Sequence, residues 1–298
     1  MEGRKHKHYH DEEFDHHLLI DTYAGRDKTD TKEELVKIPM QKIFQFLSSG
    51  IVKGETLIDL TLGAAFCHLM VLADFFKEIT ILDSSDKALE ETEKWLNKDP
   101  GAVDWSEAAE MSCELKGLSL PVTTQTLNKV ETGQTHEVDV KFARGGQEER
   151  KNVFSSELLE AEEDKVRRIV KRCLKWDPTN DNPLGSIVLP LADCAISAWY
   201  FDITCKDHAS YLNNFRKFSS LLKVGGHLIL FGFFDATYIT IGDHRFSFLN
   251  YNEDFLKEAL RDNGYTTLIF DVYESKLSTH LIDHAHIGYI VARKEREN

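Results

Sequence analysis

The chain has 298 residues, of which 42% are apolar, and a formal net charge of −14 at pH 7. This length and composition predict a globular protein of one large domain or two small ones. The negative charge argues against nucleic acid as a partner, because phosphate binding needs a basic face. We find neither an apolar run long enough for a transmembrane helix nor a signal-peptide pattern, so no membrane partner is expected.

Cysteine usage indicates a reducing compartment. The cysteines are odd in number, scattered and without a CxxC motif: Cys67, Cys113, Cys173, Cys194 and Cys205. We therefore favour reduced thiols and a cytoplasmic location.

Residues 1–17 form a histidine-rich segment that includes His6, His8 and His10. The alternating histidines are compatible with chelation of a metal such as zinc, if the segment is extended. A solvated, mobile terminus is the interpretation that we favour, and we predict no metal site.

After this segment, apolar residues recur with alternating helical and strand spacing. Pro39 is expected to interrupt or kink the first helix. Residues 114–153 are polar with weak alternation, which predicts an inserted loop or hairpin. We expect helices over 31–48, 64–75, 87–97, 155–174, 207–222 and 253–263, and strands over 55–62, 78–83, 192–198, 226–234, 266–273 and 286–293.

The order of these elements predicts the fold class. Strands and helices alternate, but the last two strands have no helix between them. That pattern is typical of an α/β domain whose mainly parallel sheet ends in an antiparallel hairpin. Residues 18–298 are predicted to form this single domain.

The turn after the first strand is the most informative feature. A buried strand from Leu57 leads through Thr61, Leu62 and Gly63 into a helix, and the next strand ends at Asp83. This is the pattern of the first half of a nucleotide-binding sheet. Small residues are favoured where the backbone approaches a ligand closely, and Thr61 and Leu62 depart from this pattern.

Many segments in the same order resemble one family. They are Leu57–Asp59, Phe76–Ile79, Asp83, Glu93–Leu96, Asp104–Ser106, Pro183–Gly185, Ala192–Cys194, Ser220–Lys223, Gly225–Gly226, Ile241–Gly242 and Val291–Lys294. The chain is identified as a diverged member of the nicotinamide, phenylethanolamine, indolethylamine and thioether methyltransferases. The resemblance implies a Rossmann-like class I methyltransferase fold, with a mainly parallel seven-stranded sheet, helices on both faces and S-adenosylmethionine as cofactor.

The resemblance also implies which residues bind the cofactor. Asp83 matches the acid that holds the ribose hydroxyls, a role that suits a carboxylate at this position. Asp177 matches an aspartate that binds the adenine amino group, although a turn residue before a proline is the alternative. Tyr23 matches a tyrosine that covers the cofactor carboxylate, with a core tyrosine as the alternative. Gly63 and Ala198 complete the predicted set.

Several positions depart from the family around the methionine end of the cofactor. The family turn reads Gly-Ser-Gly-Pro where this chain has Thr61 to Ala64, and further departures occur at Leu18, Cys67, Ser84 and Ala88. Each hydrogen bond lost to a charged group costs about 1.5–3 kcal/mol. The sequence therefore predicts a weakened cofactor site.

An aromatic substrate pocket is predicted from Trp199, Phe233 and Phe248, for which ordinary core packing is the alternative. Asp202 and Asp235 are the candidate catalytic acids, expected to pair with a cationic amine near this pocket. The small-molecule ligand is thus expected to be aromatic or an amine.

Two functions remain open at this point. The first is methyl transfer from S-adenosylmethionine to an amine or aromatic nitrogen, with impaired activity. The alternative is a catalytically inactive methyltransferase fold that binds a small molecule or has a structural role. Methyl transfer needs mainly an in-line arrangement of nucleophile, methyl group and sulfur, so the outcome depends on cofactor binding.

Overall fold

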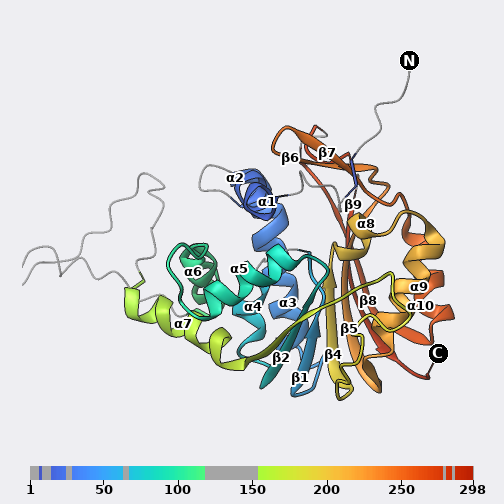
Figure 1. Ribbon diagram of the computed structural model, residues 1–298, viewed down its shortest axis with the longest axis horizontal. Helices are drawn as coiled ribbons and strands as arrows, with labels where there is room; N and C mark the ends of the chain where they lie inside the picture. The colour runs from blue at the N-terminus through green and yellow to red at the C-terminus, as the bar shows by residue number, and fades with distance from the viewer. Residues whose placement is uncertain are drawn as a thin grey trace, which may run out of the picture.

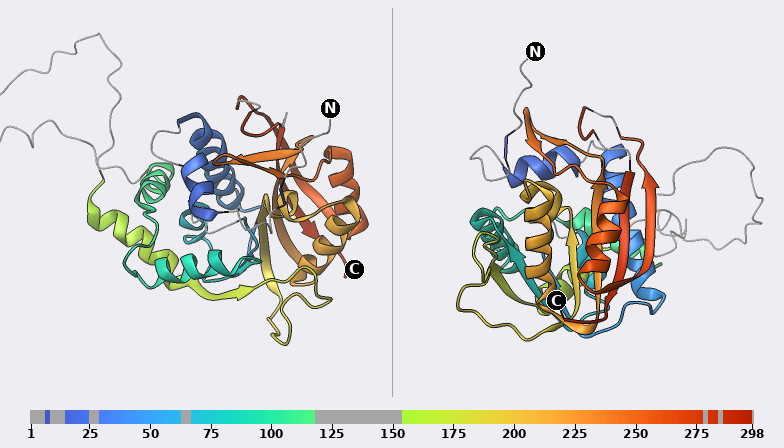
Figure 2. Two further views of the ribbon diagram at one scale, coloured as in Figure 1. Left: turned by 45° about the horizontal axis from the view of Figure 1, so that its top comes forward. Right: turned by 90° about the vertical axis from the view of Figure 1, so that its right-hand side faces the viewer.

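The protein is a sheet flanked by helices on both faces (Figure 1). Two further views show the same layers from other directions (Figure 2). The computed structural model describes residues 7–8, 15–24, 29–62, 67–117, 154–277, 280–283 and 286–297.

Seven strands form the main sheet in the order β3-β2-β1-β4-β5-β9-β8. They are β1 (Thr56–Asp59), β2 (Glu78–Asp83), β3 (Val170–Lys175), β4 (Ala192–Ala198), β5 (Leu222–Phe234), β8 (Tyr265–Glu274) and β9 (His286–Lys294). Neighbours from β3 to β5 are parallel, and β9 is antiparallel to both β5 and β8. The predicted mainly parallel sheet with a terminal antiparallel hairpin is confirmed.

Helices divide between the two faces of the sheet (Figure 1). One face carries α1 (His16–Tyr23), α2 (Thr29–Lys32), the π-helical turn η1 (Glu33–Lys37), α3 (Ile38–Ser48), α4 (Cys67–Leu72), α5 (Asp86–Leu96), α6 (Ser106–Leu115) and α7 (Ser156–Ile169). The other carries α8 (Tyr200–Thr204), α9 (His208–Ser219) and α10 (Glu253–Asp262). A small hairpin of β6 (Tyr238–Ile241) and β7 (His244–Ser247) contacts α1.

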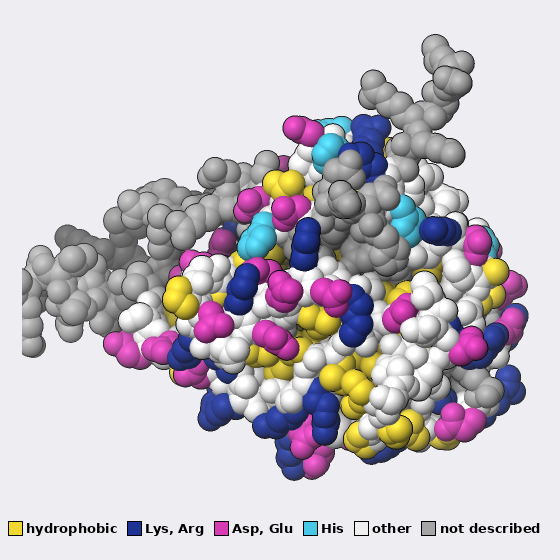
Figure 3. Space-filling view, viewed as in Figure 1, with side chains coloured by type: hydrophobic (Ala, Val, Ile, Leu, Met, Phe, Trp, Pro, Cys, Tyr) yellow, Lys and Arg dark blue, Asp and Glu magenta, His cyan; other side chains and the backbone are white. Residues whose placement is uncertain are grey.

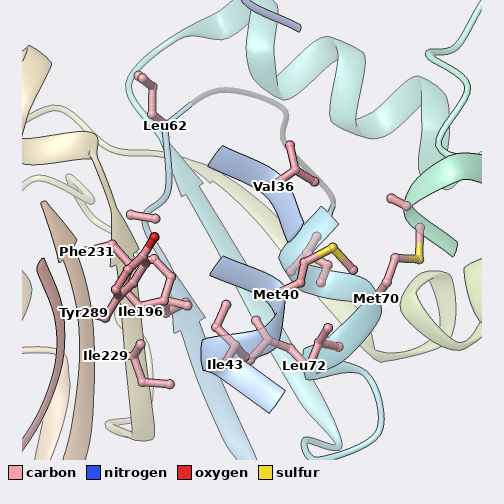
Figure 4. Packing of buried hydrophobic residues seen from close by; sticks show 14 of the residues in the cluster. Val36, Met40, Ile43, Leu62, Met70, Leu72, Ile196, Ile229, Phe231 and Tyr289 are labelled. Atoms are coloured by element: carbon pink, nitrogen blue, oxygen red, sulfur yellow. The ribbon is translucent and has the colours of Figure 1, made fainter. Parts of the chain in front are cut away.

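Two apolar cores follow from the alternation of side chains along the strands, which point to opposite faces of a sheet. Ile196 of β4 and Ile229 of β5 are register partners in the core beneath α3, where Ile43 faces them (Figure 4). The preceding pair, Ala195 and Leu228, belongs to the core beneath α9 and α10. Both faces of the central strands are therefore buried, as parallel strands require.

The helix expected over 155–174 is too long. It ends at Ile169, and residues from Val170 onward form β3, which pairs with β2. The apolar residues Ile169, Val170 and Leu174 fit helical spacing, but Val170 has an extended backbone with φ −71° and ψ 114°. Pairing with the edge of the sheet overrides the local helical pattern, as tertiary context commonly does.

The first expected helix is divided. Residues 29–48 form α2, η1 and α3, and Pro39 lies in the first turn of α3, directly after the π-helical turn. The helical backbone does not break at Pro39 but changes type, because proline lacks the N–H that a regular α-helix needs and the wider π-helical turn precedes it. Four elements were not expected from the sequence: α1, α6, α8 and the β6–β7 hairpin.

Some expectations fall outside the described residues. Most of the histidine-rich segment and residues 118–153 lie there, so the domain division and the insertion stay predictions. The five cysteines are free thiols. Within the described ranges, no helix combines the length and apolar character that crossing a bilayer requires. On the face shown in Figure 3, acidic and basic side chains are interspersed.

Asp193 joins the amino ends of three neighbouring strands. Its Oδ2 accepts hydrogen bonds from the N–H groups of Glu55 (2.8 Å) and Thr56 (3.1 Å), and its Oδ1 accepts one from Lys223 Nζ (2.6 Å). Partial burial acts to raise the pKa of Asp193, but the hydrogen bonds from Lys223, Glu55 and Thr56 outweigh it and hold this pKa well below its usual range. The ionised carboxylate thus stabilises the centre of the sheet.

We expect Asp193→Asn to lower the free energy of unfolding by about 1.5–3 kcal/mol at neutral pH, since it removes hydrogen bonds to a charged group. A carboxylate with a depressed folded-state pKa stabilises above its unfolded value of about 3.9 and loses this contribution as pH falls below it. Urea denaturation of both proteins at pH 7 and pH 3 tests this. If the difference in free energy of unfolding between wild type and Asp193→Asn is the same at both pH values, the prediction is contradicted.

Candidate functional site

The carboxyl ends of β1 and β4 border a crevice, because α4 follows β1 on one face of the sheet and α8 follows β4 on the other. Two backbone hydrogen bonds extend the pairing beyond β1: Leu60 N–H to Ile196 O (2.9 Å) and Leu62 N–H to Ala198 O (3.1 Å). The Thr61 hydroxyl accepts a hydrogen bond from the Ala198 N–H at 3.3 Å. Thr61 and Ala198 therefore lie together at the point where a sheet of this kind binds ligands.

A cavity of about 860 Å³, counted with its open mouth, adjoins this point. Figure 4 shows Val36 and Met40 on one side of it, and Leu62 and Phe231 on the other. Leu19 and Ile20 of α1 also line it. No Asp, Glu, Lys or Arg of the described residues lines the cavity. It is suited to an uncharged, apolar ligand group, because a buried charge needs a partner.

The structure brings the three predicted pocket aromatics together in the wall of this cavity. The Trp199 and Phe233 rings stack with centroids 5.6 Å apart, and Phe233 stacks on Phe248 at 5.4 Å. Trp199 has a left-handed backbone with φ 58°, a conformation that only a few per cent of non-glycine residues adopt. Its indole is directed into the stack by this turn between β4 and α8.

Tyr23 also lines the cavity, and α1 places it there. Its hydroxyl donates to the carbonyl oxygens of Thr240 (2.6 Å) and Leu281 (3.2 Å). Burial raises the pKa of Tyr23 well above its usual range. The hydroxyl thus joins α1 to the β6 hairpin, and its proton is engaged within the protein.

Asp83 lies where the sequence analysis placed it, at the carboxyl end of β2 beside β1. It is 3% exposed, and its Oδ1 accepts the N–H of Ser85 at 2.7 Å. Ser85 in turn caps α5 by accepting the Ala88 N–H at 3.3 Å. The turn therefore fixes the direction of the Asp83 carboxylate at the edge where a ribose would bind.

Asp177 follows β3 in an exposed turn. Its carboxylate accepts hydrogen bonds from the Thr179 N–H (2.9 Å), the Thr179 hydroxyl (2.5 Å) and Asn180 Nδ2 (2.7 Å). These bonds, led by that from the Thr179 side chain, lower the pKa of Asp177. The alternative given for this residue, a turn residue before Pro178, matches this geometry. Its role toward adenine stays a prediction.

Asp202 and Asp235 do not line the cavity. Asp202 is 2% exposed, and its Oδ1 accepts the Phe233 N–H (2.8 Å) and the Tyr251 hydroxyl (3.0 Å). Burial raises the pKa of Asp202 to about 7, although these two hydrogen bonds act to lower it. Asp235 is exposed in a left-handed turn with φ 60°. The structure thus brings neither carboxylate to the predicted pocket.

A buried histidine–aspartate pair at the cavity was not predicted. His68 Nε2 lies 2.6 Å from Asp59 Oδ2, and His68 lines the cavity from α4. Asp59 ends β1 and is 2% exposed. The available signal was an acid at the end of the first buried strand, followed by a histidine at the start of the next helix.

The described residues fit S-adenosylmethionine in part. Asp83 offers a fixed carboxylate for the ribose, and the cavity meets the crevice at Thr61 and Ala198. Gly63 lies outside the described residues. Leu62, the last described residue before this turn, is buried and apolar. No group of three or more His, Cys, Asp or Glu side chains within the described ranges is arranged to hold a metal ion.

The pKa of Asp202 generates a prediction for Asp202→Asn. The pKa of Asp202 is higher in the folded state than in the unfolded state. Its stabilising contribution to the free energy of unfolding is therefore fully present below about pH 4 and is lost as pH rises toward about 7. The asparagine keeps the acceptor oxygen without the charge. We expect the variant to gain stability relative to wild type between pH 5 and pH 8, by on the order of 1–3 kcal/mol.

Urea denaturation across this pH range measures the effect. Asp235→Asn is the matched control, since the same change on an exposed carboxylate should leave the difference from wild type constant within about 0.5 kcal/mol. If the free energies of unfolding of wild type and Asp202→Asn change in parallel with pH, the raised pKa of Asp202 is contradicted.

Comparison with known proteins agrees with this architecture. A model of the NNMT/PNMT/TEMT family matches residues 4–144 and 147–295. Human nicotinamide N-methyltransferase is 31% identical, covering 91% of this chain and 89% of that protein. Mouse indolethylamine N-methyltransferase is 29% identical, covering 93% of this chain and 90% of that protein. Human phenylethanolamine N-methyltransferase is 27% identical, covering 74% of this chain and 66% of that protein. The chain belongs to the NNMT/PNMT/TEMT family of methyltransferases.

Proposed function

We propose that the protein transfers a methyl group from S-adenosylmethionine to a nitrogen atom of a small, uncharged aromatic compound. The observation that carries this proposal is the cavity, which reaches the β1–β4 crevice at Thr61 and Ala198 and is lined, among the described residues, without any Asp, Glu, Lys or Arg side chain. The related N-methyltransferases support the reaction type.

Asp83 is the residue that would hold the cofactor ribose, because its carboxylate accepts hydroxyl donors at the edge of β2. When bound, S-adenosylmethionine supplies an electrophilic methyl group on a cationic sulfur. The aromatic faces of Trp199 and Phe233 favour a nearby cation through their π-electrons. Leu62, the last described residue before the turn that would face the methionine end, adds no polar partner there.

The cavity residues contribute orientation and exclusion of water. Stacking on the Phe233–Phe248 pair would fix the plane of an aromatic acceptor. A neutral nitrogen loses less free energy on leaving water than an ammonium group, which would be buried without a carboxylate to pair with among the described lining residues. An uncharged aromatic acceptor is therefore the best fit.

We also infer a cytosolic location and action without nucleic acid. The five free thiols favour a reducing compartment, and the net charge of −14 disfavours binding to phosphate backbones.

Cofactor binding is tested with Asp83→Asn, which keeps an oxygen to accept the Ser85 N–H but removes the charge. We expect the affinity for S-adenosylhomocysteine to fall by about 10-fold or more, measured by calorimetry, because a hydrogen bond to a charged group is worth about 1.5–3 kcal/mol. Asp86→Asn is the control, since this side chain lies three residues further along the chain, at the start of α5, and is 78% exposed. Its affinity should stay within about twofold of wild type.

If wild type binds neither S-adenosylmethionine nor S-adenosylhomocysteine at millimolar concentration, the proposal is overturned. The alternative of a non-catalytic small-molecule-binding protein would then be favoured.

The acceptor class is tested by transfer of a labelled methyl group to quinoline and to phenylethylamine at pH 7.5. Quinoline is an uncharged aromatic nitrogen base at this pH, whereas phenylethylamine carries an ammonium group. We expect kcat/KM to be at least about tenfold higher for quinoline, since burying an unpaired charge is costly. A preference for phenylethylamine would show that a carboxylate outside the described lining residues serves the site.

A further inference from the structure

The His68–Asp59 pair is built into the cavity wall and has no role in the function proposed so far. Asp59 is the last residue of β1, and His68 is the second residue of α4, so the pair bridges the turn between them. His68 is 8% exposed and lines the cavity, and its Nε2 lies 2.6 Å from Asp59 Oδ2. The other carboxylate oxygen, Oδ1, is buried, and no donor within the described residues reaches it.

The direction of this hydrogen bond fixes the tautomer of the neutral imidazole. An ionised carboxylate only accepts, so Nε2 carries the proton and donates it to Asp59. In the neutral ring, Nδ1 then holds a lone pair. No hydrogen-bond partner of Nδ1 is found in the described part of the chain, and this nitrogen is not among the buried unsatisfied atoms. Its lone pair is therefore available on the cavity side of the ring.

The other titratable groups that line the cavity cannot take a proton near neutral pH. Burial raises the pKa of the Cys67 thiol to about 12, so the thiol is protonated. The Tyr23 hydroxyl is also protonated and donates to two backbone carbonyls. His68 is thus the lining side chain with a free basic site.

We propose that His68, oriented by Asp59, accepts the N–H proton of an azole, an aromatic ring that holds both an N–H and a lone-pair nitrogen. This inference rests on the proposed methyl transfer and narrows its acceptor class. The stack of Trp199 and Phe233 suits the planar ring, and His68 Nδ1 accepts the N–H. A hydrogen bond of this kind selects azoles over aromatic bases that lack an N–H.

The step balances in atoms and charge. The lone-pair nitrogen of the azole forms a bond to the methyl carbon while the carbon–sulfur bond breaks and leaves its electron pair on sulfur. The N–H proton on the other ring nitrogen passes to His68 Nδ1. The products are a neutral N-methylazole and an imidazolium, and the Asp59 carboxylate stabilises that imidazolium.

Two probes that differ only in the N–H test the recognition without turnover. Calorimetry should show that benzimidazole binds wild type about tenfold more tightly than 1-methylbenzimidazole, the worth of one good hydrogen bond. In His68→Phe, which keeps an aromatic ring but no lone pair, the two affinities should become equal within about twofold. Cys67→Ala, a change at a neighbouring lining residue, should keep the preference.

Asp59→Asn gives a second test that does not depend on the folding of His68→Phe. The amide can donate to Nε2 and shift the proton to Nδ1, which turns the acceptor toward the cavity into a donor. The preference for benzimidazole should then be lost. A purely structural pair would change both affinities in parallel, and thermal denaturation of each variant identifies loss of fold.

Several outcomes overturn the inference. These are equal affinities in wild type, a preference that persists in both variants, or no binding of either probe at millimolar concentration. The proposed methyl transfer is overturned by a different result, namely that wild type binds neither S-adenosylmethionine nor S-adenosylhomocysteine. If S-adenosylhomocysteine binds and labelled methyl transfer to benzimidazole is as fast in His68→Phe as in wild type, the role of His68 is wrong while the methyl transfer stands. We expect that rate to fall by about 100-fold or more.

Discussion

The pairing of β1 with β4 is the constraint on which the site depends. Asp59 and Ile196 are register partners, and the backbone bonds from Leu60 and Leu62 continue the pairing past the end of β1. A slip of one residue would turn each side chain of β1 to the opposite face. It would remove Asp59 from His68, and the cavity would lose the wall that Leu62 forms. The hydrophobic alternation that builds the two cores therefore also sets the direction of the polar groups at the crevice.

The two faces of the sheet use buried carboxylates differently. On the face beneath α9, Asp202 is bonded to the Phe233 N–H and the Tyr251 hydroxyl, and both donors belong to the protein. On the face beneath α4, Asp59 has one hydrogen-bond partner among the described residues, His68, which itself lines the cavity. The Asp202 carboxylate is engaged by donors of the protein itself, whereas a carboxylate that directs a free nitrogen into a cavity can act on a ligand.

The fold could be predicted from the sequence because its signals are local. The strands at 78–83 and 192–198 follow from short apolar runs bounded by turns, and both agree with the structure. β3 was missed because its apolar residues fit a helix equally well, and only pairing with β2 makes the segment a strand. In the site, Asp83 and the aromatic pocket were predicted from position and residue type.

Other parts of the site depend on contacts that no local pattern shows. The donors to Asp202, at Phe233 and Tyr251, lie far along the chain, and burial by them keeps this acid from the cavity. Thr61 was taken as an obstacle to the cofactor, yet its hydroxyl accepts the Ala198 N–H across the crevice. Whether a polar residue serves the fold or a ligand is decided by these long-range partners, and those follow only from the packed structure.

The apolar lining also determines how strongly one polar group can discriminate. In an apolar cavity of this size, packing alone distinguishes ligands that differ by a methyl group by about 1–3 kcal/mol. A buried lone pair held in place by a second buried group adds a different kind of selection, because a ligand without a donor leaves that lone pair without a hydrogen bond. Asp59 fixes the His68 ring, so the ring cannot turn its lone pair toward another partner. The selectivity of the cavity therefore resides in the one wall where β1 and α4 meet.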